Sequence, residues 1–420
     1  MQNRPTEFPV ARTTGRRSGW VRRRGPATIV ELGRARADST APEVARPAEQ
    51  LALPPASVVI RQPYRAHGLP LSALDRSAGM FVGRDQQIAR VVRIVADQEP
   101  TVVMVRGPRK IGTTSLLHHL SVRLGTEVIP VVVEMQTSIG ATESAAGFLH
   151  ELADVIVSRS TARTGRMLPY PSVDQFAHDP YPAFNRWLDR VEIALGGRRL
   201  LLCIDEFDVI DRQLRAGRLD TRVLDLLRSL VLHRRQIQLL LAGSTHLAEL
   251  TPAWASALGS TMAVELGPLE TEEAIHLLLC PEPGFPAVYT PSAVDAILGW
   301  TARHPFLIQV MGASVLRPLV DTEWHARRER LTADDVTRSI PEALDRAETY
   351  LLDVWQTQVP SAEARGWLRL LAAGRRPSVP EVLTDDLLVM QRRRIVTRGP
   401  DGWRLEIPLF AQYIRDRHSI

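Results

Sequence analysis

Short apolar runs and amphipathic stretches alternate through the middle of the chain. The apolar runs have the length of strands and lie at residues 102–105, 128–134, 200–204, 237–242 and 262–266. Stretches with apolar residues at helical spacing accompany them, at residues 88–95, 115–120, 148–157, 184–195 and 223–231. Strands that are apolar throughout are typical of sheets buried on both faces. The pattern therefore predicts an α/β domain whose parallel sheet is flanked by helices, with a ligand site at the carboxyl ends of the strands.

The C-terminal part of the chain has a different pattern. Helical stripes at residues 351–355, 367–371 and 382–388 precede two short strand-like runs at 395–397 and 403–407. The turn Arg398-Gly399-Pro400-Asp401-Gly402 separates these two runs, as is typical of a hairpin. Three helices and a hairpin predict a winged-helix domain.

Charge is concentrated at the N-terminus. Residues 1–50 contain ten arginines and five acidic residues, whereas the rest of the chain has 42 charges of each sign. The segment also lacks apolar periodicity, so residues 1–60 are expected to form a disordered basic tail. A basic tail can bind nucleic acid by releasing counterions, although most such tails are only solvated extensions.

The remaining composition is that of an ordinary globular protein. The chain has 420 residues, of which 45% are hydrophobic and 24% charged, enough for two or three domains. Cys203 and Cys280 lie far apart in apolar surroundings, which favours a reducing compartment over a disulfide framework. No uncharged apolar run reaches the roughly 18 residues of a membrane helix, and no apolar signal region follows the arginine-rich start. We expect a cytoplasmic protein without membrane contact.

A loop with two glycines follows the first apolar run. Its sequence is Gly107-Pro108-Arg109-Lys110-Ile111-Gly112-Thr113-Thr114-Ser115, and a helical stretch comes next. Strand, glycine loop and helix are the context of a phosphate-binding loop, G-x-x-x-x-G-K-[ST]. In that motif backbone N–H groups bind phosphates, the lysine contacts the β- and γ-phosphates, and the hydroxyl residue binds Mg²⁺. Thr114 occupies the hydroxyl position. Thr113, however, occupies the position of the lysine, and the only lysine of the chain, Lys110, lies three residues earlier.

Two adjacent carboxylates follow the third apolar run. Residues 200–204 lead directly into Asp205 and Glu206. At the end of a buried strand Asp205 can hold Mg²⁺, and Glu206 can polarise the water that attacks a γ-phosphate. A solvated acidic turn is the alternative, and the phosphate loop upstream favours the nucleotide site. We interpret Asp208 as structural.

The fourth apolar run ends in Gly243-Ser244-Thr245-His246. A hydroxyl at this edge of the sheet is a candidate sensor of the γ-phosphate, with Ser244 or Thr245 in that role. Hydroxyl residues at strand ends form turns or caps equally often.

The order of these motifs resembles that of the AAA+/STAND class of P-loop ATPases, in particular bacterial and archaeal members related to origin-recognition ATPases. The resemblance covers residues 62–415. It implies a P-loop NTPase core of the AAA+/ASCE type over residues 61–268, a helical lid over 269–345 and a winged helix over 346–420. It also implies ATP or ADP with Mg²⁺ as ligands. The matching motifs are Phe81-Val82-Gly83-Arg84-Asp85, residues 106–117, residues 202–208, Leu266-Gly267-Pro268-Leu269 with Glu272-Glu273-Ala274, and Arg303-His304-Pro305-Phe306-Leu307-Ile308-Gln309.

The resemblance adds Arg84 and Pro305 to the nucleotide-binding residues, and it exposes two departures. Thr113 replaces the family lysine, and Arg303 replaces the glycine that precedes His304-Pro305. Losing a charge-assisted contact costs roughly 1.5–3 kcal/mol, so another cation would be needed to keep the affinity. The candidates are Lys110, Arg109 and Arg303. Our hypothesis is that Arg303 or Lys110 partly restores the charge; the alternative is that Lys110 points to solvent and hydrolysis has decayed.

Three classes of function follow. The intact pair Asp205 and Glu206 beside a lost lysine favours a switch that binds ATP or ADP with little turnover and whose lid reports the bound nucleotide. Its output would come from homo-oligomerisation or from an effector protein. The second class is a DNA-binding AAA+ regulator of replication or mobile elements, which would use the winged helix, residues 392–394 and the basic tail. The third is a nucleotide-free ATPase-like scaffold. Residues 345–420 hold twelve arginines and ten acidic residues, a weak excess for a DNA reader.

Overall fold

A computed structural model describes residues 58–71, 78–97, 101–165, 167–258, 261–321, 323–324 and 330–418. The basic tail expected at residues 1–60 lies almost entirely outside these ranges. The described chain begins with β1 (Val58–Val59), which pairs antiparallel with β7 (Glu323–Trp324). A short helical turn, η2 (Ala78–Met80), precedes the first helix.

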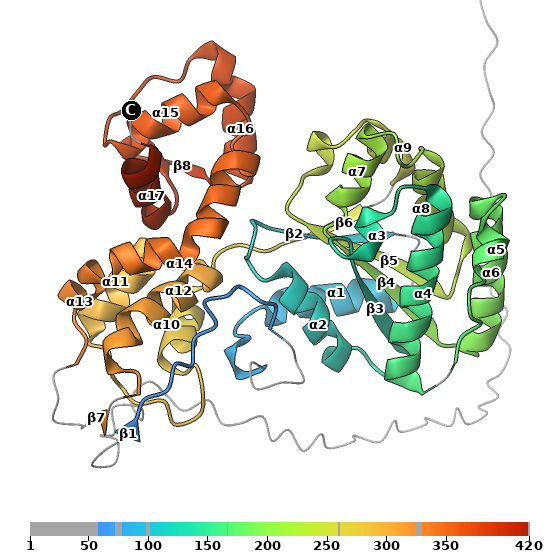
Figure 1. Cartoon of the computed structure of the whole chain (residues 1–420), viewed down its shortest axis with the longest axis horizontal. Coiled ribbons are helices and arrows are strands. Elements are labelled where there is room, and N and C mark those ends of the chain that lie inside the picture. The colour runs from blue at the N-terminus through green and yellow to red at the C-terminus, as the bar shows by residue number, and fades with distance from the viewer. Residues whose placement is uncertain are drawn as a thin grey trace, which may run out of the picture. The chain divides into compact units, whose positions relative to one another are not determined.

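A parallel sheet of five strands forms the centre of the N-terminal part (Figure 1). The strand order is β3-β4-β5-β2-β6. The strand before the glycine loop, β2, lies between β5 and β6, and β5 separates it from β4, which ends at Asp205. The predicted parallel sheet is confirmed. Its strands are β2 (Val102–Arg106), β3 (Val128–Glu134), β4 (Arg199–Asp205), β5 (Ile237–Gly243) and β6 (Thr261–Glu265).

Helices cover both faces of the sheet. Val103, Val105 and Leu201 face a core shared with α1 (Asp85–Asp97) and α2 (Thr113–Arg123), whereas Met104 and Leu202 face the other core. Burial of both faces explains why the strands are apolar throughout, since each fully buried side chain of this size stabilises the fold by roughly 1.5–3 kcal/mol. The second face is covered by α4 (Ala145–Thr164), α6 (Pro180–Leu195) and α8 (Arg222–His233), with the shorter α3 (Ser138–Ala141), α5 (Val173–Phe176), α7 (Asp208–Arg215), η3 (Leu247–Glu249) and α9 (Ala253–Ala257).

The helices after the sheet share one continuous core with the C-terminal helices and with residues 60–71. The boundary that we predict between residues 345 and 346 falls inside α14 (Ile340–Asp353). The preceding helices are α10 (Thr271–Leu279), α11 (Pro291–Thr301), α12 (Pro305–Leu316), η4 (Arg317–Leu319) and α13 (Ala333–Arg338). None of the helices in the described ranges is both long and apolar enough to cross a membrane.

A π-helical turn, η5 (Val354–Gln358), continues α14 toward the C-terminal helices. The N–H of Val359 donates to the carbonyl of Val354, a bond that spans five residues. Beyond it lie α15 (Ala362–Ala372), η6 (Glu381–Leu383), α16 (Thr384–Arg392), the antiparallel strands β8 (Val396–Gly399) and β9 (Gly402–Leu405), and α17 (Pro408–His418). The expected hairpin is present, and we call residues 362–418 the C-terminal unit. Its assignment as a winged helix stays a prediction.

Candidate functional site

The glycine loop connects β2 to α2 and lines a cavity of about 830 Å³, a size typical of ligand pockets. At Gly107 the backbone passes so close to β6 that a Cβ atom would lie 2.6 Å from the carbonyl oxygen of Leu266. Gly112 has φ 104°, which favours glycine, and directs the chain into the first turn of α2. Thr113 and Thr114 of that turn line the cavity. Free N–H groups at a helix N-terminus bind anions well, so the loop is suited to phosphate.

Thr114 and Asp205 meet at the edge of this cavity. The Thr114 hydroxyl donates a hydrogen bond of 2.5 Å to Asp205 Oδ2, and the N–H of Glu206 donates to Oδ1 at 3.1 Å. Burial raises the pKa of Asp205 to about 6, although both hydrogen bonds act to lower it. Glu134, its neighbour on β3, raises this pKa further.

This hydroxyl and carboxylate pair fits Mg²⁺, which takes few protein ligands and completes its shell with water and phosphate oxygens. Across the described part of the chain, no group of three or more His, Cys, Asp or Glu side chains is placed to hold a metal ion. A metal at Thr114 and Asp205 would therefore depend on the nucleotide for further ligands.

Glu206 lies in the left-handed region, with φ 54°, where a non-glycine residue is strained by roughly 1–2 kcal/mol. Its Oε2 atom is buried and has no hydrogen-bond partner, whereas Oε1 lies 4.0 Å from Nη1 of Arg109. Burial raises the pKa of Glu206, and Arg109 acts in the opposite direction. Asp208, whose role we interpret as structural, accepts a 2.6 Å hydrogen bond from Arg212. Glu206 lines the cavity with a side chain that is 35% exposed, although Oε2 itself is covered.

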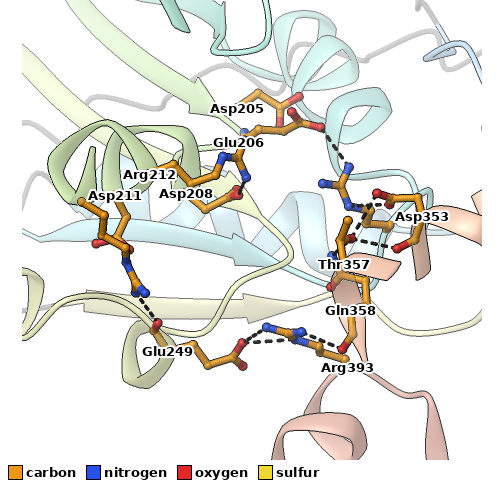
Figure 2. Close-up of polar contacts among 12 residues, drawn as sticks. Asp205, Glu206, Asp208, Asp211, Arg212, Glu249, Asp353, Thr357, Gln358 and Arg393 are labelled. Atoms are coloured by element: carbon orange, nitrogen blue, oxygen red, sulfur yellow. Dashed lines mark hydrogen bonds and ion pairs between the residues drawn. The ribbon is translucent and has the colours of Figure 1, made fainter. Parts of the chain in front are cut away.

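Asp353, at the end of α14, completes the charged part of the site (Figure 2). Its Oδ2 lies 3.0 Å from Nε of Arg109, so the glycine loop is joined to the helix that leads to the C-terminal unit. In Figure 2 the carboxylates of Glu206 and Asp353 are drawn with the ion pairs of Arg109 as dashed lines between them. Sequence reasoning missed Asp353, because it belongs to no motif and lies more than two hundred residues beyond the loop.

Arg84 and His304 contact backbone carbonyls of the glycine loop. Arg84 is buried and donates to the carbonyls of Ile111, at 3.2 Å, and Gly267, at 2.7 Å. His304 Nε2 lies 3.0 Å from the carbonyl oxygen of Arg109, so this nitrogen carries the proton. Burial lowers the pKa of His304 to about 4, with Arg84 adding to the effect. His304 is therefore neutral at physiological pH, and Pro305, which begins α12, lines the cavity beside it.

The residues lining the cavity include every residue of the predicted site except Arg303 and, of the two candidate sensors, Thr245. Ser115 and Ser244 are among its lining residues. Lys110 also lines it, but its ammonium group donates a 2.8 Å hydrogen bond to the carbonyl of Gly68. The Arg303 side chain lies elsewhere: its guanidinium donates to the hydroxyl of Thr271 at 3.4 Å and lies 3.9 Å from Glu270.

Residues 65–71 also line the cavity and are a second part of the site that sequence reasoning missed. The N–H of Leu71 donates to the hydroxyl of Ser115 at 2.9 Å, and the N–H of Arg65 donates to Gln309 at 3.1 Å. This segment therefore links α2 to α12. The sequence Gln62-Pro63-Tyr64, with which the resemblance begins, carries no signal for these contacts.

No protein-family model and no curated protein matches the sequence. Solved structures match in fold. The Walker-type ATPase PABY2304 of Pyrococcus abyssi aligns with a TM-score of 0.57 and 14% identity, over 80% of this chain and 96% of that chain. The ORC2 protein of Aeropyrum pernix, in ADPNP–ADP complexes, aligns with a TM-score of 0.50 and 16% identity, over 80% and 94%. The chain therefore has the P-loop AAA+ fold of these structures, as the order of its motifs predicts.

Proposed function

We propose that this protein binds ATP or ADP with Mg²⁺ in the cavity beside the glycine loop and acts as a regulatory switch with weak or lost hydrolysis. The observation that carries the proposal is the contact between Thr114, in the first turn of α2, and Asp205, at the end of β4, on the wall of an 830 Å³ cavity. A hydroxyl and a carboxylate at this position are the protein ligands that Mg²⁺ uses beside a bound triphosphate.

Each part of the site has a role in this proposal. The N–H groups of the loop and of the first turn of α2 bind the phosphates, and Thr114 and Asp205 hold the metal. Magnesium, when bound, neutralises phosphate charge and makes the γ-phosphorus easier to attack. Glu206 orients and polarises water through its carboxylate, which is partly exposed in the cavity. Ser244, which follows β5 and lines the cavity, senses the γ-phosphate in this proposal.

Thr113 is the reason for weak or lost hydrolysis. A lysine at this position would neutralise charge that develops on the β- and γ-phosphates, and a threonine hydroxyl offers only a neutral hydrogen bond. The ground-state contacts of the backbone survive the replacement, because they do not depend on the side chain. Binding should therefore be retained better than turnover.

The test compares Mg-ATP affinity and phosphate release for the natural protein, Thr113→Lys, Glu206→Gln and the double variant. We expect the natural protein to bind Mg-ATP with little release, Thr113→Lys to raise the release rate about tenfold or more, and Glu206→Gln to abolish that gain. Glu206→Gln should still bind nucleotide, since Glu206 acts on water. Absence of Mg-ATP and Mg-ADP binding in all four proteins would leave the nucleotide-free scaffold as the better description.

DNA binding through residues 392–394 has less support. Arg393 forms an ion pair with Glu249 of η3, and Arg394 pairs with Glu406 at 3.0 Å, so two of the three arginines are engaged inside the molecule. Salt-sensitive DNA binding that is lost on Arg392→Gln would favour this second function. Output from the switch would otherwise pass to a second copy of the chain or to an effector protein.

A further inference from the structure

The site lacks a lysine beside the phosphates, and its cations differ in what they contact. Lys110 donates to the Gly68 carbonyl, and Arg303 contacts Thr271 outside the cavity. Arg84 is held by the carbonyls of Ile111 and Gly267. These three cations would have to leave their present partners or change position to reach a phosphate.

Arg109 is in a different position. It lies on the glycine loop itself, it lines the cavity, and its guanidinium already extends to Glu206. Nη1 lies 4.0 Å from Glu206 Oε1, and Nε lies 3.0 Å from Asp353 Oδ2. The Nε atom of Arg109 is buried and makes no hydrogen bond. Its contact with Asp353 is therefore an ion pair without the fixed direction of a hydrogen bond.

The surroundings of Arg109 are half-buried, which strengthens charge interactions relative to those in open water. The Arg109 side chain is 27% exposed, and those of Glu206 and Asp353 are 35% and 30% exposed. A bound triphosphate would bring more negative charge into this space than either carboxylate. A planar guanidinium can donate from two nitrogens to phosphate oxygens, which is a better match than the contact of one nitrogen with a single carboxylate.

We propose that Arg109 supplies the cation missing at Thr113, and that it exchanges Asp353 for the phosphates when nucleotide binds. This inference rests on the proposed nucleotide function and names the residue that couples the nucleotide to the rest of the chain. Without nucleotide, Arg109 joins the loop to α14. With nucleotide, Asp353 loses its partner and the end of α14 is released from the loop.

The released segment leads directly to the C-terminal unit. Asp353 is the last residue of α14, η5 begins at the next residue, and the carbonyl of Gln358 in η5 accepts a 2.7 Å hydrogen bond from Arg393. The contact between Asp353 and Arg109 is therefore placed where a change of charge in the cavity alters the restraint on the C-terminal unit.

The experiment is a double-mutant cycle on the full chain, with Arg109→Gln, Asp353→Asn and the double variant, read out by calorimetric Mg-ATP affinity. Arg109→Gln should weaken binding about tenfold or more. Asp353→Asn should strengthen it severalfold, because the competing carboxylate is gone, and this gain should vanish when Arg109 is also replaced. If the contact between Arg109 and Asp353 only stabilised the site, both single substitutions would weaken binding.

The matched control is Arg123→Gln with Asp85→Asn, an exposed ion pair of 3.1 Å between α2 and α1; it should leave Mg-ATP affinity unchanged. Hydrogen exchange provides the second readout. Mg-ATP should speed exchange in η5 of the natural protein but not of Arg109→Gln. Binding by the natural protein without a gain in Asp353→Asn would overturn this inference and leave the proposed function intact. Absence of nucleotide binding by the natural protein would overturn both.

Discussion

Asp205 is subject to two opposed requirements. It must be ionised to hold Mg²⁺, yet burial raises its pKa to about 6. Lowering the pH through about 6 therefore protonates the residue in the nucleotide-free protein and removes a metal ligand. We expect the gain in ATP affinity that Mg²⁺ confers to shrink across this range. Titration calorimetry on the natural protein and on Asp205→Asn, each with and without Mg²⁺, separates this effect from protonation of the nucleotide, which both proteins share.

Asp205→Asn provides the control for this prediction. Its residual Mg²⁺ effect should vary less as pH passes through about 6 than that of the natural protein, because residue 205 no longer titrates. The effect of pH on folding stability has the opposite sign. A carboxyl whose pKa is raised on folding costs stability once it is ionised, so the contribution of Asp205 falls by up to about 3 kcal/mol as pH rises from about 4 through 6. A Mg²⁺ effect that is flat with pH in the natural protein would contradict the proposed role of Asp205.

Among the elements, the connection from α11 to α12 shows why a glycine is expected before His304. Ala302 and Arg303 both lie in the left-handed region, with φ 47° and φ 59°. The departure at Arg303 thus concerns backbone conformation as well as charge, and the side chain does not line the cavity. The cost of the left-handed conformation at Arg303 is offset because the chain continues into α12, where Pro305 is favoured in the first turn.

Arg303→Gly should therefore stabilise the protein by up to about 1 kcal/mol, the gain from relief of the left-handed conformation less the greater freedom of glycine in the unfolded chain. The thermal unfolding midpoint measures this change, and Ala302→Gly should shift it in the same direction. A lower midpoint for Arg303→Gly would mean that the contacts with Thr271 and Glu270 outweigh the strain. A loss of nucleotide affinity in this variant would support Arg303 as the substitute cation instead.

How far the sequence predicts these elements depends on the range of the interactions. The five strands and the glycine loop follow from local apolar runs and from short motifs, and Asp205 follows from its place at the end of β4. The contacts of Arg109 with Asp353 and of Lys110 with Gly68 could not be predicted, because they join residues that are distant along the chain and carry no shared pattern. The same holds for the inward contact of Arg393, which as one of three adjacent arginines has the pattern of an exposed basic run.

For the whole molecule, the ion pair between Arg393 and Glu249 links the C-terminal unit directly to the α/β part. The side chains are only 17% and 9% exposed, and Arg393 also donates to the Gln358 carbonyl. Removing one partner of a buried ion pair leaves the other charge without compensation, at a cost of about 3 kcal/mol.

We expect Arg393→Gln to lower the opening free energy of α16 by about 3 kcal/mol, measured by native-state hydrogen exchange, while the central strands β4 and β5 stay protected. Arg376→Gln is the control, since Arg376 and Asp401 form an exposed pair of 3.8 Å in the same unit. Equal effects of the two substitutions would show that the link to Glu249 does not restrain the C-terminal unit.

The π-helical turn η5 determines how the chain beyond it would move when Asp353 is released. It holds one residue more than an α-helical turn would need over the same stretch, between the side chain that contacts the glycine loop and the carbonyl that contacts Arg393. If this turn relaxed to α geometry, the chain beyond it would rotate by about 100° and advance by about 1.5 Å. Loss of the ion pair in the cavity would then rotate the C-terminal unit about the helix axis and not simply bend it away. The rotation would present a different face of the unit to a binding partner.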